Sequence, residues 1–190
     1  MRKSLFLVLI ATMFLMTACA GPGTKQVKVA VSLPLGLGIG EDILDAVQLA
    51  LEEEDSRAGD IDVELLILDT SDPEGSPVSP ELEQDAAQQA IEDPEVVAYL
   101  GPLASDQAKE SIPMLNQAGI ALISPAATWP GLTKPGYEPG EPGIYYPTGR
   151  RNFFRVVPSD DVQGDAAARW AEELLIQRAY IVDEGTAYGQ

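Results

Sequence analysis

The clearest structural signal in the sequence is VVAYLGPLASDQAKESIPMLNQAGIALISPAAT, residues 96–128. It begins with a short apolar run at 96–100 that is closed by Gly101 and Pro102. Such a run is typical of a strand that is buried on both faces in a parallel sheet. A second apolar run at 120–123 predicts another buried strand.

A helix is expected between these two strands. Ser105 with Asp106 offers an N-cap, because short polar side chains accept hydrogen bonds from the unpaired N–H groups of a first helical turn. Apolar residues then recur at helical spacing, and Gly119 is placed to close the helix. Pro113 is expected to kink it.

The ends of the two strands predict a binding site. In open α/β sheets, ligands lie outside the carboxyl ends of the strands, where helix N-termini also offer N–H groups to an anion. Ser105 follows the first strand, and the small residues 126–128 follow the second. We therefore expect both to converge on one ligand.

The rest of the chain continues the alternation of strands and helices. Ser79 followed by Pro80 is a good helix start, because proline suits the first helical position. The alternation predicts an α/β fold, with a doubly wound, mostly parallel sheet and helices on both faces. Further strands are expected at 27–35, 63–68, 153–157 and 178–182, and further helices at 41–54, 81–92 and 161–177.

Two later segments carry expectations about side chains. Residues 129–151 form a long loop rich in proline and glycine, and most of its aromatic residues are expected to pack beneath it. For Trp129, which directly follows Thr128, both packing and a ligand contact stay open. The helix at 161–177 is expected to turn an apolar face inward, made of Val162, Ala166, Trp170 and Leu174 or Leu175.

The composition excludes several classes of function. The formal net charge is −18 without any basic cluster, which argues against nucleic acid and against electrostatic docking on anionic lipid. The chain has no histidine, so a Ser-His-Asp triad, a Cys-His pair and histidine metal sites are excluded within these residues. We expect no metal, no cofactor and no enzymatic activity.

The N-terminus resembles a bacterial lipoprotein signal. It has a basic start, an apolar core at 5–16 that is too short for an ordinary membrane span, and small residues before Cys19. Cleavage before Cys19 would leave its thiol to carry diacylglycerol. An ordinary secretory signal with an incidental cysteine is the alternative.

Four segments resemble the type I periplasmic binding proteins, the leucine/isoleucine/valine-binding family of ABC-importer receptors. They are LGPLASDQA, AGIALISPAAT, FFRVVPSDDVQG and AYIVDEGTAYG, in the family's order, and the resemblance covers residues 27–190. It implies a first lobe at 27–157 and the start of an incomplete second lobe at 158–190. The lipoprotein-like N-terminus before them predicts a signal peptide at 1–18 and a tether at 19–26. The resemblance also implies that Ser105, Ala126, Ala127 and Thr128 form the ligand site, with Tyr188 closing over it from the second lobe.

The function implied by this resemblance is a lipid-anchored, extracytoplasmic receptor that delivers an amino acid, of branched-chain type or similar, to the membrane subunits of an ABC importer. A ligand-sensing module of the same fold is the alternative within binding proteins. A nucleotide-dependent enzyme is the rival, because glycines at 36–40 follow the first strand and Asp69 ends the next, as in dinucleotide-binding units. The spacing of those glycines does not match, because the third comes one residue early.

Overall fold

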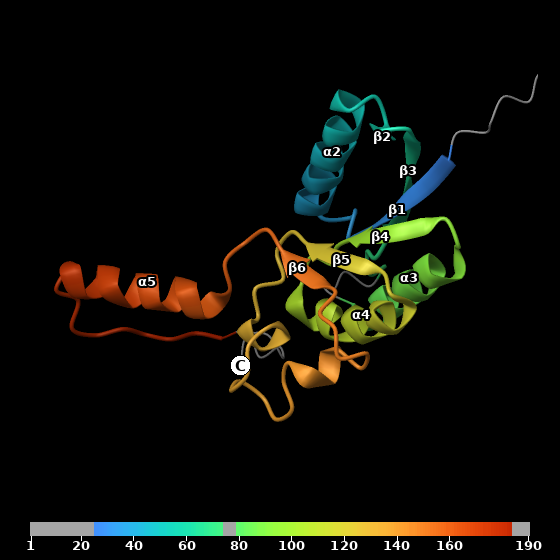
Figure 1. The fold of residues 1–190 in the computed structure, drawn as a ribbon. Coiled ribbons are helices and arrows are strands. Elements are labelled where there is room, and N and C mark those ends of the chain that lie inside the picture. The colour runs from blue at the N-terminus through green and yellow to red at the C-terminus, as the bar shows by residue number, and fades with distance from the viewer. Residues whose placement is uncertain (1–24, 74–78, 184–190) are drawn as a thin grey trace, which may run out of the picture.

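The computed structural model describes residues 25–73 and 79–183, so Cys19 and Tyr188 lie outside the described residues (Figure 1). Its centre is a six-stranded sheet in the order β2-β3-β1-β4-β5-β6. Neighbouring strands are parallel except for the short β2, which pairs antiparallel with β3. This confirms the predicted doubly wound, mostly parallel sheet. The strands are β1 (Lys25–Leu33), β2 (Arg57–Ala58), β3 (Ile61–Asp69), β4 (Val96–Leu100), β5 (Ala121–Ser124) and β6 (Phe153–Arg155).

Helices lie on both faces of the sheet. One face is covered by α2 and the other by α3 and α4, as Figure 1 shows. The main core lies on the face of α3 and α4, where small alanines of the helices meet large residues of the strands and of the loop after β5. The helices are α2 (Gly38–Glu53), α3 (Pro80–Glu92), α4 (Ser105–Ala118) and α5 (Asp160–Glu173), with short 3-10 turns η1 (Pro130–Leu132) and η2 (Gly143–Tyr145).

The predicted start of α3 is confirmed. The hydroxyl of Ser79 accepts a hydrogen bond from the N–H of Leu82, and Pro80 is the first helical residue.

Replacing Ser79 with alanine should lower the free energy of unfolding by about 1 kcal/mol, because one N–H of the first turn loses its partner. Urea unfolding of the full-length protein would measure this. Gln88 lies later in the same helix and its side chain is exposed, so Gln88→Ala should change the free energy of unfolding much less. Equal effects of the two substitutions would contradict the capping role.

The predicted N-cap of α4 is wrong by one residue. The cap is Ala104, whose N–H donates to the side-chain oxygen of Gln107, and Ser105 is already helical. The hydroxyl of Ser105 instead accepts a hydrogen bond from the N–H of Trp129. Gly119 closes the helix with a left-handed backbone (φ 76°), as predicted, and Pro113 lies inside it. The kink expected at Pro113 stays a prediction.

The α2 helix begins at Gly38, earlier than the predicted start at 41. Gly40 is buried in its first turn, and a side-chain carbon there would lie 2.2 Å from the backbone oxygen of Pro34. The glycine therefore lets the helix start close against the end of β1. The sequence pattern placed these glycines in the preceding turn because glycine is a poor helix former.

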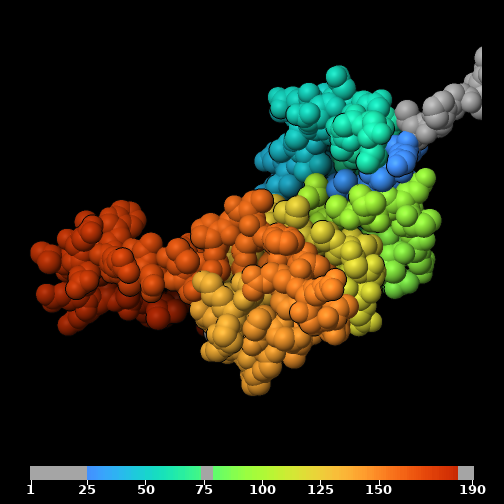
Figure 2. All heavy atoms as spheres, viewed as in Figure 1, coloured from blue at the N-terminus to red at the C-terminus, as the bar shows by residue number. Residues whose placement is uncertain are grey.

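The segment after β6 does not match its prediction. The prediction that the helix of this segment turns an apolar face inward is wrong for the described residues. Trp170 is 66% exposed and Leu175 82% exposed, and no residue of α5 is buried. The strand expected at 178–182 is also absent from the described residues. Figures 1 and 2 show the reason: α5 stands away from the sheet, so no described element covers it or offers a strand edge.

Candidate functional site

The topology of the sheet places a candidate site at the carboxyl ends of β4 and β5. From β1 the chain builds outward to β3 on one side, and then crosses to β4, β5 and β6 on the other. Ligands of doubly wound folds bind in the crevice at such a change of direction. Here the change of direction lies between β1 and β4, and β5 is the next strand after β4.

A partly buried hydrogen bond joins these two segments. The hydroxyl of Ser105, which is only 3% exposed, accepts the N–H of Trp129 at 3.0 Å. It ties the first turn of α4 to the backbone directly after Thr128. Ala127 is buried, and Ala126 and Thr128 are half-buried. The structure thus brings together the segments that the sequence predicted to converge, residues 101–105 and the 126–129 loop.

Ser124, the last residue of β5, shapes the 126–129 loop. Its hydroxyl donates to the carbonyl oxygen of Pro102 at 2.6 Å. The same oxygen accepts the N–H groups of Ala127 at 2.9 Å and of Ala126 at 3.3 Å. The N–H groups of Ala126 and Ala127 therefore have a hydrogen-bond acceptor inside the protein, and the bond to Ala127 helps to fix the shape of the loop.

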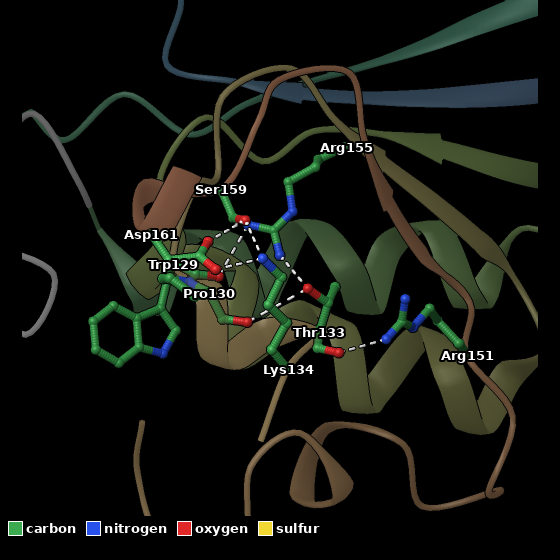
Figure 3. Close-up of polar contacts among 8 residues, drawn as sticks. All are labelled: Trp129, Pro130, Thr133, Lys134, Arg151, Arg155, Ser159 and Asp161. Carbon is green, nitrogen blue, oxygen red and sulfur yellow. Dashed lines mark hydrogen bonds and ion pairs between the residues drawn. The ribbon is translucent and has the colours of Figure 1, made fainter. Parts of the chain in front are cut away.

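A second side chain that holds this loop, and that no sequence pattern indicated, is Arg155 of β6. Figure 3 shows its guanidinium pointing toward Trp129 and Thr133. Nη1 donates to the carbonyl oxygens of Ala127 at 3.0 Å and of Trp129 at 2.9 Å, and Nη2 donates to the Thr133 hydroxyl at 2.7 Å. The available signal was a single arginine inside an otherwise apolar strand of a strongly acidic chain.

The loop is also tied to the start of α5. The N–H of Asp160 donates to the carbonyl oxygen of Thr128 at 3.0 Å. Next to it, the ammonium group of Lys134 binds the Asp161 carboxylate and the Ser159 hydroxyl (Figure 3). The hydrogen bonds from Lys134 and then Ser159 lower the pKa of Asp161 to about 2. The carboxylate therefore stays charged at neutral pH.

Trp129 packs within the long loop, which agrees with the first of the two roles that the sequence left open. Its indole N–H donates to the buried carboxylate of Glu141 at 2.9 Å, and the ammonium group of Lys109 lies 4.8 Å from the ring centre. Tyr137 meets the same ring edge-on at 5.7 Å between centroids. In Figure 3 the indole points away from Arg155.

The expected packing of the loop tyrosines is confirmed for Tyr145 and Tyr146, which are 5% and 9% exposed. Tyr145 donates its hydroxyl to Glu141 at 2.6 Å, and Tyr146 donates to the carbonyl oxygen of Leu132. Tyr137 is 42% exposed and lies at the loop surface. Glu141 is thus the polar centre of this loop, a role that the sequence did not indicate.

The turn between β1 and α2 does not favour the nucleotide-binding alternative. One carboxylate oxygen of Asp69 accepts the N–H of Leu35 at 3.1 Å and the N–H of Ser71 at 2.9 Å. The Ser71 hydroxyl also donates to Asp69 and accepts the N–H of Gly36. Burial alone would raise the pKa of Asp69, but these hydrogen bonds lower it. Asp69 therefore holds the turn, instead of standing ready for a ribose hydroxyl.

A buried acid that the sequence missed lies on the other side of the sheet. Glu83 of α3 is fully buried. Its carboxylate accepts hydrogen bonds from the hydroxyls of Ser32 at 2.5 Å and Tyr99 at 2.9 Å. Burial raises the pKa of Glu83 to about 7, although the hydroxyls around it act in the opposite direction. Glu83 is thus the described carboxyl that we expect to titrate near neutral pH.

Between residues 25 and 183, leaving out 74–78, no helix is long and apolar enough to cross a membrane. In the same part of the chain, no group of acidic, cysteine or histidine side chains is arranged to hold a metal ion.

Comparisons with known proteins agree on one family. The family model described as "Periplasmic binding protein" matches residues 27–190. The Leu/Ile/Val-binding protein BraC3 of Rhizobium johnstonii is 25% identical over 96% of the chain and 46% of its own length. The leucine binding protein LivK of Thermotoga maritima is 29% identical, with a TM-score of 0.60 over 78% of the chain and 37% of LivK.

A substrate-binding protein of an ABC transporter from Desulfitobacterium hafniense, solved in complex with Leu, has the same fold. Its TM-score is 0.68 at 23% identity, over 87% of this chain and 44% of that protein. The chain therefore spans less than half the length of each of these relatives.

Proposed function

The chain belongs to the periplasmic binding protein family, and we propose on that basis that the full-length protein binds a free amino acid, of branched-chain type or similar, outside the cytoplasm and delivers it to an ABC importer. The observation that carries the proposal is the hydrogen bond between Ser105 and Trp129, which joins the segments that follow two neighbouring strands, β4 and β5. The names of LivK and BraC3 support leucine, isoleucine and valine as the first ligands to test.

The chemistry of the crevice suits an α-amino acid. A hydroxyl accepts and donates at the same time, so Ser105 can hold the Trp129 N–H and still donate to a ligand carboxylate. The N–H and hydroxyl of Thr128 are the second donors that we propose for the carboxylate, and the carbonyl of Ala126 is the acceptor for the ammonium group. Hydrogen bonds to charged groups of this kind contribute about 1.5–3 kcal/mol each.

We further propose that residues 27–157 form the first lobe and residues 158–190 begin the second. The hydrogen bond from the Asp160 N–H to the Thr128 carbonyl supports this proposal, because it joins the start of α5 to a residue of the proposed site. We propose that the second lobe closes over the ligand, with Tyr188 as its contact. Closure of two lobes would bury a small solute without any chemical step.

A thermal-shift screen of the full-length protein tests the proposal. All standard amino acids are compared with benzoate, ATP and NAD. At a concentration of 100 times Kd, a ligand that binds only the folded state stabilises it by about 2.7 kcal/mol. We expect leucine, isoleucine or valine to raise the Tm. Stabilisation by a nucleotide and by no amino acid would overturn the proposed function.

We also propose that Cys19 carries a lipid. Cys19→Ala should release the protein from the membrane fraction or leave its signal unprocessed, because no thiol remains for the diacylglycerol. Mass spectrometry of the mature N-terminus is the measurement, with Thr17→Ser as the control that keeps the cysteine. A mature N-terminus that lies downstream of Cys19 and carries no lipid would refute the anchor.

A further inference from the structure

We infer that Lys134 anchors the start of the second lobe on the first lobe and sets the direction in which α5 leaves the sheet. The inference rests on the proposed function, because it takes residues 27–157 and 158–190 as two lobes. It gives a role to the long loop 129–151, to which the proposed function assigns none.

Packing does not fix the direction of α5 within the described chain. No residue of the helix is buried, and Figures 1 and 2 show it standing away from the sheet. Its described hydrogen bonds to the first lobe lie at its first turn and at Ser159, the residue before it. The direction of α5 relative to the sheet therefore depends on these polar contacts.

Lys134 binds two groups at the start of α5 at once. Its ammonium group donates to the Ser159 hydroxyl at 3.0 Å and forms an ion pair with the Asp161 carboxylate, as Figure 3 shows. The Ser159 hydroxyl itself donates to Asp161. Burial and then the charge of Asp161 raise the pKa of Tyr137, so a second residue of the long loop faces this carboxylate.

The start of α5 gives up a hydrogen bond of its own for this contact. Ser159 is the N-cap of α5, a position where a serine hydroxyl ordinarily accepts an N–H of the first turn. Within the described residues the hydroxyl makes no such bond, although Ser159 is only 7% exposed. The hydroxyl serves the connection between the lobes at the expense of the helix end.

Lys134 stands on a part of the first lobe that is itself fixed. Its N–H donates to the carbonyl oxygen of Pro130 at 2.9 Å. Thr133, directly before it, is held by Arg155 at its hydroxyl, at 2.7 Å, and by Arg151 at its carbonyl oxygen, at 2.6 Å. The residues of η1 are all buried. Lys134 therefore holds α5 from a fixed position.

The contact is weak enough to break and form again. The side chains of Lys134 and Asp161 are 42% and 31% exposed, so water screens their charges. Exposed ion pairs of this kind shift an equilibrium by about two- to five-fold. Because the pKa of Asp161 is lowered to about 2, the pair keeps both charges near neutral pH. It thus biases the direction of α5 without locking the second lobe in place.

The anchored turn is joined to the proposed site. The N–H of Asp160, which lies between the two anchored residues, donates to the Thr128 carbonyl oxygen at 3.0 Å. Closure over a ligand costs the second lobe part of its freedom, and a lobe whose direction is already restricted loses less. We therefore expect the anchor to strengthen ligand binding.

Distances between spin labels at Gln88→Cys in α3 and Arg169→Cys in α5 test the inference, measured by pulsed electron paramagnetic resonance. Both side chains are exposed. The labels are placed in the full-length protein with its native cysteines replaced by alanine. Lys134→Met should lower the share of the wild-type distance relative to other distances about two- to five-fold. High salt should do the same to wild type, because it screens exposed ion pairs.

Lys28→Met is the matched control, because Lys28 forms ion pairs with Asp93 and Glu95, which are not part of α5. It should leave the distances unchanged. The double variant Lys134→Asp with Asp161→Lys re-creates the ion pair with reversed charges and should restore the wild-type distance. Calorimetry should show leucine affinity about two- to five-fold weaker in Lys134→Met and recovered in the double variant.

Distances that stay the same in Lys134→Met, or that change equally in Lys28→Met, would overturn the inference. So would a double variant that behaves like Lys134→Met alone, or leucine affinity that Lys134→Met leaves unchanged. The distances are measured without ligand, so a failed inference is told apart from a failed proposed function, which the amino-acid screen decides.

Discussion

Ser105→Ala in the full-length protein should weaken amino acid binding by tens-fold. The substitution removes a donor to the ligand carboxylate, and a hydrogen bond to a charged group contributes about 1.5–3 kcal/mol. It also leaves the partly buried N–H of Trp129 without its partner, so the 126–129 loop loses its hydrogen bond to α4. Thr128→Ala should have a similar effect through the loss of its hydroxyl. Calorimetric titration of each variant with leucine measures both.

Ser111→Ala is the matched control for Ser105→Ala. Ser111 is also a buried serine of α4, but its hydroxyl donates to the backbone of Gln107 within the helix. We expect leucine affinity to stay within about two-fold of wild type in this variant. If Ser105→Ala and Ser111→Ala bind leucine equally well, the fold stands but the assignment of the site does not.

Glu83 should make the stability of the protein fall as pH rises toward neutrality. Its pKa is about 7 in the folded state against an ordinary value of 4.5, so the folded state binds the extra proton between these values. The stabilisation is complete below about pH 4.5 and is lost as pH rises through about 7. A shift of this size corresponds to roughly 3 kcal/mol.

Glu83→Gln removes this titration and keeps the shape of the side chain. The free energy of unfolding is measured with urea at about pH 5 and about pH 8 for both proteins. From the lower to the higher pH, the value for wild type should fall by roughly 3 kcal/mol more than the value for the variant. The carboxyl groups whose pKa is lowered, such as Asp161, lose their contribution only in more acidic solution, so they do not disturb this window. If the free energy of unfolding changes with pH equally in wild type and in Glu83→Gln, Glu83 is not a buried acid that is protonated in the folded state.

The parts of the fold that could be predicted depend on local patterns. β4 was predicted with its observed bounds because its apolar run is closed by Gly101 and Pro102. The start of α3 followed from Ser79 and Pro80, which act on the backbone next to them. The convergence of Ser105 with the 126–129 loop followed from a general rule about the carboxyl ends of parallel strands.

The parts that were missed depend on partners far apart in the sequence. Glu83 looks like a solvent-facing residue of an amphipathic helix, and its burial depends on Ser32, 51 positions earlier in the chain. Arg155 binds carbonyl groups 26 and 28 positions before it, which no local pattern encodes. The apolar face of α5 was predicted to turn inward from its helical spacing alone, and it is exposed because no described element packs against it.

A crystal structure of the full-length protein with the amino acid that gives the largest thermal shift tests the central claim most directly. We expect the ligand carboxylate within hydrogen-bonding distance of the Ser105 hydroxyl and the Thr128 N–H, with Arg155 behind the 126–129 loop and Trp129 still bound to Glu141. A ligand bound elsewhere, such as at the turn of residues 36–40, would contradict the assignment of the site.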